Sequence, residues 1–249
     1  IHSLQKDGYR VWYDQGILPA SEWDDAIAKK VKDAFCMEEV KAYFAIFTAA
    51  TLLIAFNILS QMGNVGDSLR HAAFQVASIM TTTGFATTDF DQWPEFSRTL
   101  LVMLMFIGAC AGSTGGGIKV SRILMYMKTI KKELGILIHP RSVKIVMMDG
   151  KKLDHPVVRA ANIFLISYAG ILVASILLLT IDNFDFTTNV TAVISALNNI
   201  GPGLSLVGPA GNFAFFSGFS KYVLMFDMLA GRLEIFPMLL LFVPYTWKK

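Results

Sequence analysis

Two short polar stretches interrupt an otherwise apolar chain, and both have residues suited to holding a cation through backbone oxygens. The first, TTTGFATT, begins at Thr81, and the second, NNIGPGLS, begins at Asn198. Glycine adopts both signs of φ, so an extended stretch containing glycine can point successive carbonyl oxygens at one axis. Such oxygens can replace the water shell of a cation, and threonine hydroxyls can add to them. The two stretches therefore predict a cation path lined by the backbone.

The composition indicates a membrane protein. Of 249 residues, 54% are hydrophobic and the mean hydropathy is +0.51, which exceeds the usual range of soluble domains. A membrane-crossing helix needs about 20 apolar residues. Four candidate spans satisfy this length: 42–60, 99–128, 160–181 and 222–247. The second contains GSTGGG, and the fourth carries Asp227, Arg232 and Glu234.

The distribution of lysine and arginine predicts the orientation of these spans. The link at 129–159 is rich in basic residues, which places it in the cytoplasm by the positive-inside rule. An even number of crossings then puts both termini in the cytoplasm as well. The net charge of +3 is therefore explained by topology and does not indicate a nucleic-acid partner.

A short apolar segment precedes each polar stretch, at 67–80 and at 185–199. A helix of about 14 residues spans only about 21 Å, too little to cross a membrane, so we expect each to enter and return on one side. The order of span, half-helix, glycine turn and span thus occurs twice, which predicts an internal repeat. Irregular backbone at membrane depth is tolerated where it lines a path for water or ions. The alternative is a polar turn after a short helix that lies flat at the membrane surface.

The second span contains five glycines, at positions 108, 112, 115, 116 and 117. Each costs a helix roughly 1 kcal/mol relative to alanine, so a straight helix is not expected here. The glycines could form a flexible barrier or let helices pack closely. A phosphate-binding loop is disfavoured because no Lys-Ser or Lys-Thr pair follows the last glycine.

Several motifs together resemble the Trk/Ktr/HKT superfamily of cation transporters, in particular the TrkH-like and KtrB-like membrane subunits of bacterial potassium uptake systems. They read SIMTTTGFATTDF, GACAGSTGGGIK, NNIGPGLSLVGP and MLAGRLEIFPML, in the family's order, and the resemblance runs from about Glu38 to the C-terminus. It implies an all-α membrane protein with two membrane-pore-membrane repeats: four transmembrane spans plus two re-entrant pore helices, with the second span broken by the glycine-rich loop. Residues 34–249 would form the C-terminal half of such a transporter, with one repeat at 38–128, the cytoplasmic link at 129–159 and one repeat at 160–249.

The resemblance also assigns roles to residues. The selectivity filter would consist of Thr82, Thr83, Gly84, Phe85, Asn199, Ile200, Gly201 and Pro202. An intramembrane gate would consist of Gly112, Ser113, Thr114, Gly115, Gly116, Gly117, Lys119 and Arg232. For Arg232, the alternative to a position in the pathway is a buried ion pair with Asp227 or Glu234.

The transported ion implied is K⁺, with no cofactor and no metal site beyond that ion; the four histidines have no metal-ligand spacing. Selectivity for K⁺ over Na⁺ stays open because the family's first-repeat filter is absent. The implied partners are a second copy of the chain, a cytoplasmic ring of nucleotide-binding regulatory subunits (TrkA-like or KtrA-like), an N-terminal half that completes the pore, and the lipid of a bacterial inner membrane.

Residues 1–33 are charged and resemble part of a TIR domain, too short to fold independently. This allows two alternative interpretations: a membrane-tethered TIR protein that signals or cleaves NAD, and an inactive fragment or rearranged gene product. Paired carboxylates, a Ser/His/Asp order and a Cys/His pair at one coherent site are missing, so the sequence does not predict an enzyme.

Overall fold

The computed structural model describes residues 34–139, 145–232 and 235–241. The chain divides into two compact units, Ile1–Met37 and Glu38–Lys249, and the elements discussed below belong to the second. The TIR-like prediction falls on residues 1–33, which lie outside the described residues.

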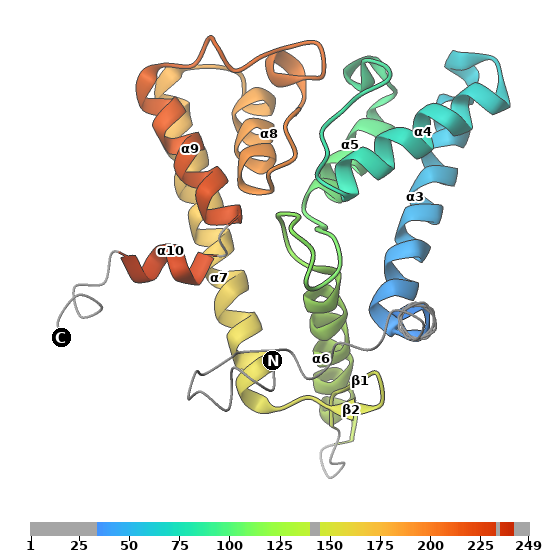
Figure 1. Ribbon diagram of the computed structural model, residues 1–249, viewed down its shortest axis with the longest axis vertical. Coiled ribbons are helices and arrows are strands. Elements are labelled where there is room, and N and C mark those ends of the chain that lie inside the picture. The colour runs from blue at the N-terminus through green and yellow to red at the C-terminus, as the bar shows by residue number, and fades with distance from the viewer. Residues whose placement is uncertain (1–33, 140–144, 233–234, 242–249) are drawn as a thin grey trace, which may run out of the picture. The chain divides into compact units, whose positions relative to one another are not determined.

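Two long apolar helices are the main supports of the second unit (Figure 1). They are α3 (Glu38–Met62) and α7 (His155–Leu179), the latter continued by the 3-10 turn η2 (Thr180–Asp182). Both are apolar around most of their circumference, which is typical of helices surrounded by lipid. By length and composition, these two helices can cross a membrane.

A short helix follows each long one: α4 (Val65–Met80) after α3 and α8 (Phe186–Leu197) after α7. Asn64 caps α4 by accepting a hydrogen bond from a backbone amide, and Asp185 caps α8 in the same manner. At 16 and 12 residues these helices are about 24 and 18 Å long. Neither reaches the length that a membrane span requires.

The glycine-rich loop, residues 106–119, separates α5 (Glu95–Met105) from α6 (Val120–Ile138). It contains no helix, as its glycine content predicts. The two ends of the loop are joined, because the Gly108 amide donates to the Ile118 carbonyl (2.9 Å). The second span is therefore two helices joined by an irregular loop.

The fourth expected span, 222–247, differs from the prediction. Helix α9 runs from Gly218 to Arg232, and a separate helix α10 (Ile235–Leu241) runs across its direction (Figure 1). Hydropathy alone predicted one continuous transmembrane helix. In the structure α9 instead ends where Arg232 hydrogen-bonds the glycine-rich loop, which supplies a polar partner for a charge that lipid would not tolerate.

The basic link contains more regular structure than its charge suggested. Helix α6 extends into it as far as Ile138, and a hairpin follows, formed by β1 (Met147–Met148) and β2 (Lys151–Lys152). The hairpin turn is Asp149-Gly150, both with positive φ, which is the preferred pair for a tight two-residue turn.

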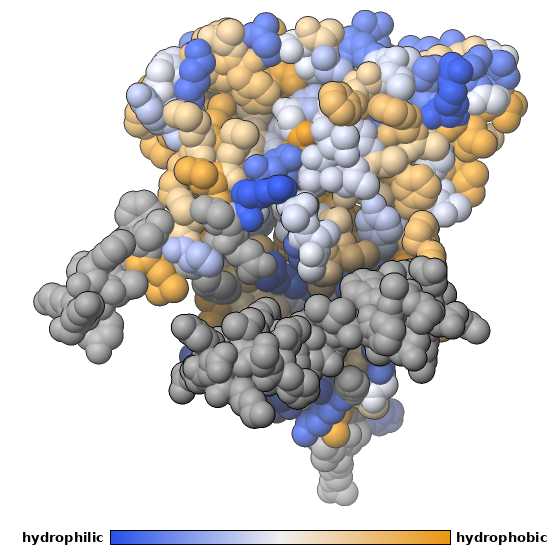
Figure 2. Space-filling view, in the orientation of Figure 1, coloured by the Kyte–Doolittle hydropathy of each residue, from blue (hydrophilic) through white to orange (hydrophobic). Residues whose placement is uncertain are grey.

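One buried apolar cluster links α3, α4 and α5 to α8 and to the segment that follows α8. It combines residues of α3, α4 and α5 with Ile194 of α8 and with Ile200 and Leu204, which follow α8. Other apolar residues remain exposed, and Figure 2 shows hydrophobic residues over the flank formed by α7 and α9, with strongly hydrophilic residues gathered near the centre of the same view. This distribution suits a helical unit with lipid at its sides and a polar interior.

Candidate functional site

Each short helix ends in a glycine turn, and the two turns follow the same backbone path. We define the first glycine turn as residues 81–85 and the second as residues 198–202. Thr82 and Asn199 each have a φ of 55°, and two positions later Gly84 and Gly201 have φ values of 81° and 116°. Only glycine adopts the φ values of positions 84 and 201 freely, which explains why glycine stands at both of these positions.

The hydrogen bonds of the two turns also correspond. In the first, the Thr83 amide donates to the Ser78 carbonyl (2.8 Å); in the second, the Ile200 amide donates to the Ser195 carbonyl (3.0 Å). The turns differ in the role of the serine hydroxyl: that of Ser78 donates to the Phe85 carbonyl (2.5 Å), whereas that of Ser195 accepts from the Gly201 amide (3.1 Å). The Phe85 carbonyl, expected at the filter, thus already accepts a hydrogen bond.

The two glycine turns lie against each other. A Cβ atom on Gly84 would lie less than 3.0 Å from the Ile200 carbonyl oxygen and 3.4 Å from Cδ of Pro202. A Cβ on Gly201 would lie 3.8 Å from Cα of Gly84. The structure thus brings the predicted filter glycines together although they are far apart in sequence.

A cavity of about 690 Å³ borders both turns. Its lining includes Thr82 and Thr83 from the first turn and Asn199, Ile200 and Gly201 from the second. Lining groups from α9 are mostly apolar. The polar groups of this lining are backbone oxygens, the hydroxyls of Thr82, Thr83 and Ser195, the amide of Asn199, and the ammonium of Lys221 on α9, which donates to the Ala214 carbonyl (2.7 Å).

The glycine-rich loop packs directly against both turns. A Cβ on Gly116 would lie less than 3.0 Å from the Asn198 carbonyl, and a Cβ on Gly115 would lie 3.3 Å from the Thr82 hydroxyl oxygen. At Gly116, only a residue without a side chain allows this approach. The loop therefore forms the neighbouring layer of the site.

Two cationic side chains hold three successive carbonyls of this loop. The Lys119 ammonium donates to the carbonyls of Ser113 (3.0 Å) and Gly115, and the Arg232 guanidinium donates to the carbonyl of Thr114. A smaller cavity of about 160 Å³ lies here, and its described lining carries Lys119, Arg232 and also Arg122 but no carboxylate. Three positive charges beside a small cavity oppose the presence of a cation.

Asp227 does not pair with Arg232 among the ion pairs of the described residues. Asp227 is buried and accepts a hydrogen bond from the Ser175 hydroxyl of α7 (2.7 Å). Glu234, the other candidate partner, lies outside the described residues. The observed contact of Arg232 is with the glycine-rich loop.

A family model described as TrkH, cation transport protein, matches residues 42–249. This chain belongs to the TrkH family. The family is described as cation transport proteins, which are transporters and not enzymes.

Named relatives agree with this assignment. The Trk system potassium uptake protein TrkH of Vibrio parahaemolyticus is 44% identical over 182 residues, covering 73% of this chain and 37% of the relative. The TrkH of Salmonella typhimurium is 39% identical over 203 residues, covering 80% and 42%.

A solved structure has the same fold. The crystal structure of the potassium transporter TrkH from Vibrio parahaemolyticus matches with a TM-score of 0.79 and 39% identity, over 86% of this chain and 46% of that one. The chain spans less than half the length of the TrkH relatives named here.

Glu39 of this TrkH-family chain was missed by sequence reasoning. It is almost fully buried at the start of α3, and its carboxylate accepts hydrogen bonds from the amides of Ala111 (2.7 Å) and Ser121 (3.0 Å). It thereby fixes the glycine-rich loop to the N-terminus of α6. A signal was present: α6 begins after Lys119, which cannot cap a helix, so an acceptor had to come from elsewhere.

Asn198 and Gly231 were also missed. Asn198 is fully buried, and its side-chain oxygen accepts a hydrogen bond from the Tyr168 hydroxyl of α7 (2.9 Å). A Cβ on Gly231 would lie less than 3.0 Å from the Leu197 carbonyl, so α9 approaches the end of α8 as closely as backbones allow. The sequence signal for the contact of Gly231 with Leu197 was a glycine next to a charged residue, Arg232, in an apolar span.

The described residues contain no group of three or more His, Cys, Asp or Glu side chains that could hold a metal ion.

Proposed function

We propose that this chain forms half of a transmembrane potassium pathway whose filter includes the two glycine turns. The filter residues are Thr82, Thr83, Gly84, Phe85, Asn199, Ile200, Gly201 and Pro202. The single observation that carries the proposal is the direct apposition of Gly84 with Ile200 and Gly201. Two non-helical turns that meet inside a helical membrane protein need a polar occupant, and a dehydrated cation supplies one.

The helices α4 and α8 support this role. Both end at the glycine turns, so both direct the negative ends of their dipoles toward the place where the turns meet. That field favours a cation and opposes an anion. The same arrangement of half-helices is used for ions in other membrane proteins.

The glycine-rich loop acts as the gate of the pathway. Its residues are Gly112, Ser113, Thr114, Gly115, Gly116, Gly117 and Lys119, together with Arg232 of α9. Three of its carbonyls are held by Lys119 and Arg232, so a passing K⁺ must move the loop and meet two fixed positive charges. Positive φ angles at Gly112 and Gly117 give the loop the backbone freedom that such a movement needs.

The complete pathway needs more than the two repeats of this chain, 38–128 and 160–249. The chain spans less than half of its relatives, and two re-entrant turns do not surround an ion on all sides. A further half with two more glycine turns completes the path, in a bacterial inner membrane that holds both termini on the cytoplasmic side. The assembly is a homodimer of such complete units.

The cytoplasmic link, 129–159, contacts a ring of nucleotide-binding regulatory subunits. Support comes from α6, which carries Lys131 and Lys132 in its C-terminal half. Reversing these two charges should abolish capture of a cognate ring in a pull-down. Equal capture by wild-type and reversed chains would contradict this contact.

Rescue of growth at low K⁺ tests the pathway itself. Cells without their own potassium uptake receive this chain alone, and then this chain with a donor N-terminal half; we expect rescue with the donor half. Gly84→Ser and Gly201→Ser should weaken the preference for K⁺ over Na⁺, because a side chain at Gly84 would clash with the Ile200 carbonyl and one at Gly201 would strain a backbone with a φ of 116°.

Gly170→Ser provides the matched control, since Gly170 lies in α7 and has open space around it. It should keep the wild-type preference. Equal ion preference in the wild type, the control and both filter variants would remove the filter assignment.

A further inference from the structure

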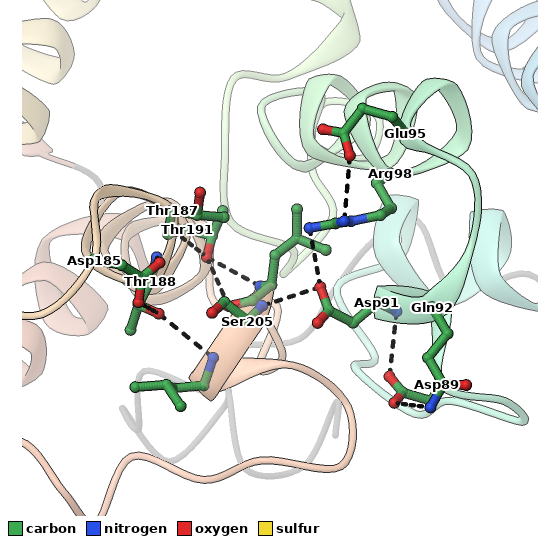
Figure 3. Close-up of polar contacts among 12 residues, drawn as sticks. Asp89, Asp91, Gln92, Glu95, Arg98, Asp185, Thr187, Thr188, Thr191 and Ser205 are labelled. Atoms are coloured by element: carbon green, nitrogen blue, oxygen red, sulfur yellow. Dashed lines mark hydrogen bonds and ion pairs between the residues drawn. The ribbon is translucent and has the colours of Figure 1, made fainter.

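A hydrogen-bonded contact joins the two repeats just beyond the glycine turns. The chain after the first turn forms a short 3-10 helix, η1 (Phe90–Gln92), and the chain after the second forms another, η3 (Ser205–Val207). The Asp91 carboxylate on η1 accepts a hydrogen bond from the Ser205 amide at the start of η3 (3.0 Å; Figure 3). We name the Asp91–Ser205 contact the clasp.

The carboxylate of the clasp is held in place by an arginine. Arg98 on α5 lies 3.4 Å from Asp91 Oδ1 through Nη2 and 3.2 Å from Glu95 Oε2 through Nη1. The side chains of Asp91 and Arg98 are only about one quarter exposed (27% and 25%). Because a neighbouring guanidinium compensates its charge, Asp91 is better suited to fixing geometry than to attracting ions.

The other side of the clasp is fixed by hydroxyl groups of α8. Thr191 accepts a hydrogen bond from the Leu204 amide (3.0 Å), and Thr188 accepts one from the Leu206 amide (3.4 Å; Figure 3). Ser205 between them has a φ of 58°, a left-handed angle that an L-residue keeps only when its surroundings hold it. The segment 204–206 is thus bound to its own repeat on one side and to Asp91 of the other repeat on the opposite side.

The clasp is connected to the filter through packed side chains. Phe90 and Leu204, which flank the clasp, belong to the same buried cluster as Ile200. The carbonyl of Ile200 is the atom that approaches Gly84. A change in the separation of Asp91 and Ser205 therefore moves the group that sets the spacing of the two glycine turns, because a close-packed cluster transmits displacement.

We propose that Asp91 is a positioning residue for ion selectivity, which holds the two glycine turns at a fixed separation by clasping the Ser205 amide. This inference rests on the proposed function. Carbonyls that are held at one separation discriminate between cations of different size, and carbonyls free to move apart do so less.

Amide hydrogen exchange of the full chain in lipid nanodiscs tests the clasp without any need for transport. Asp91→Ala removes the acceptor, so exchange at residues 204–206 should become about tenfold faster or more. Asp91→Asn keeps an oxygen acceptor and should change exchange much less. Unchanged exchange in Asp91→Ala would overturn the clasp, and slow exchange in α3 and α7 verifies that the variant is folded.

Ion uptake with the donor N-terminal half tests selectivity. At equal protein abundance, the ratio of Rb⁺ to Na⁺ uptake should fall about threefold or more in Asp91→Ala and should be largely restored in Asp91→Asn. Asp89→Asn is the matched control, since Asp89 lies in the same loop and, among the described residues, its side chain accepts hydrogen bonds only from η1: from the amide of Asp91 (3.2 Å) and the side chain of Gln92 (3.0 Å).

The outcomes separate three cases. An equal loss of selectivity in Asp91→Asn, Asp89→Asn and Asp91→Ala would mean that the negative charge of residues 89 and 91 sets the selectivity. That result would overturn the positioning role of Asp91. An unchanged ratio in Asp91→Ala would also overturn it. Absence of transport by the wild-type chain and by every variant would overturn the proposed function, and the selectivity role of Asp91 with it. Hydrogen exchange would still decide whether Asp91 joins the two repeats.

Discussion

Thr81 and Thr83 of the first glycine turn are exposed, and their hydroxyls hydrogen-bond each other (2.8 Å). Asn198 and Ile200 of the second turn are buried, and Asn198 is tied to Tyr168 of a neighbouring helix. The two turns have corresponding backbone angles, yet the first is held mainly by its own residues and the second by the core around it. The comparison teaches that one backbone geometry can be maintained in two ways.

This difference has a functional meaning under the proposed pathway. The second turn, bounded by α7, α9 and the glycine-rich loop, serves as a rigid reference against which the first turn is placed. The first turn depends on contact with the second through Gly84 and on the clasp at Asp91. Substitutions around the two turns should therefore have unequal effects.

The largest effect is expected at the contact between the glycine-rich loop and the second turn. Gly116→Ala places a Cβ less than 3.0 Å from the Asn198 carbonyl, which belongs to buried backbone and cannot move aside. We expect a loss of about 3 kcal/mol in the free energy of unfolding. Denaturant titration of the purified chain in detergent measures it.

The adjacent Gly115→Ala is the control for the first turn. Its Cβ would lie 3.3 Å from the Thr82 hydroxyl, which rotates away easily, so the loss should stay below about 1 kcal/mol. If the two alanine variants are equally stable, the second turn is no more rigidly held than the first.

An intermediate effect is expected from the hydrogen bond that only the second turn makes with a long helix. Tyr168→Phe leaves the buried side-chain oxygen of Asn198 without its donor, which should cost about 1 to 3 kcal/mol. Thr81→Val removes an exposed hydroxyl of the first turn and should cost less than about 0.5 kcal/mol. Thermal unfolding followed by intrinsic fluorescence compares the two; a larger loss in Thr81→Val would reverse the assignment of rigid and adaptable turns.

The smallest effect concerns the caps of the two short helices, which differ in their response to pH. The pKa of Asp185 is lowered, first by the hydrogen bond from the Thr188 hydroxyl (2.5 Å). A carboxylate whose pKa is lowered by folding stabilises the folded state fully when the pH is above its pKa in the unfolded chain, about 3.9. This contribution is lost as the pH falls through the pKa of the folded state. The cap of α4 is Asn64, which does not titrate.

Acid should therefore weaken α8 before α4. Asp185→Asn should change stability by no more than about 0.5 kcal/mol at neutral pH, because asparagine caps helices as well as aspartate does. The stability advantage of the wild type over this variant should shrink below about pH 4, because protonation removes the charge of the Asp185 carboxylate. Melting temperatures between about pH 7 and pH 3 decide this; a constant difference for Asp185→Asn would contradict the assigned cap.

Local patterns predicted most of the helices. The apolar runs at 42–60 and 160–181 became α3 and α7, and the glycines of the loop at 106–119 excluded helix there. The fourth span was predicted as one run, and the structure divides its described part into α9 and α10. Hydropathy measures the preference of a segment for lipid, but not which segment its charges and glycines will contact.

The sequence by itself predicted the apolar helices and the glycines that adopt positive φ at positions 84 and 201, because hydropathy and backbone freedom are properties of neighbouring residues. Tertiary structure decided which groups meet: Gly84 with Ile200, Arg232 with Thr114, Glu39 with the start of α6, and Asp91 with Ser205. These pairs lie far apart along the chain. Their contact depends on how whole helices pack, and no local pattern encodes that.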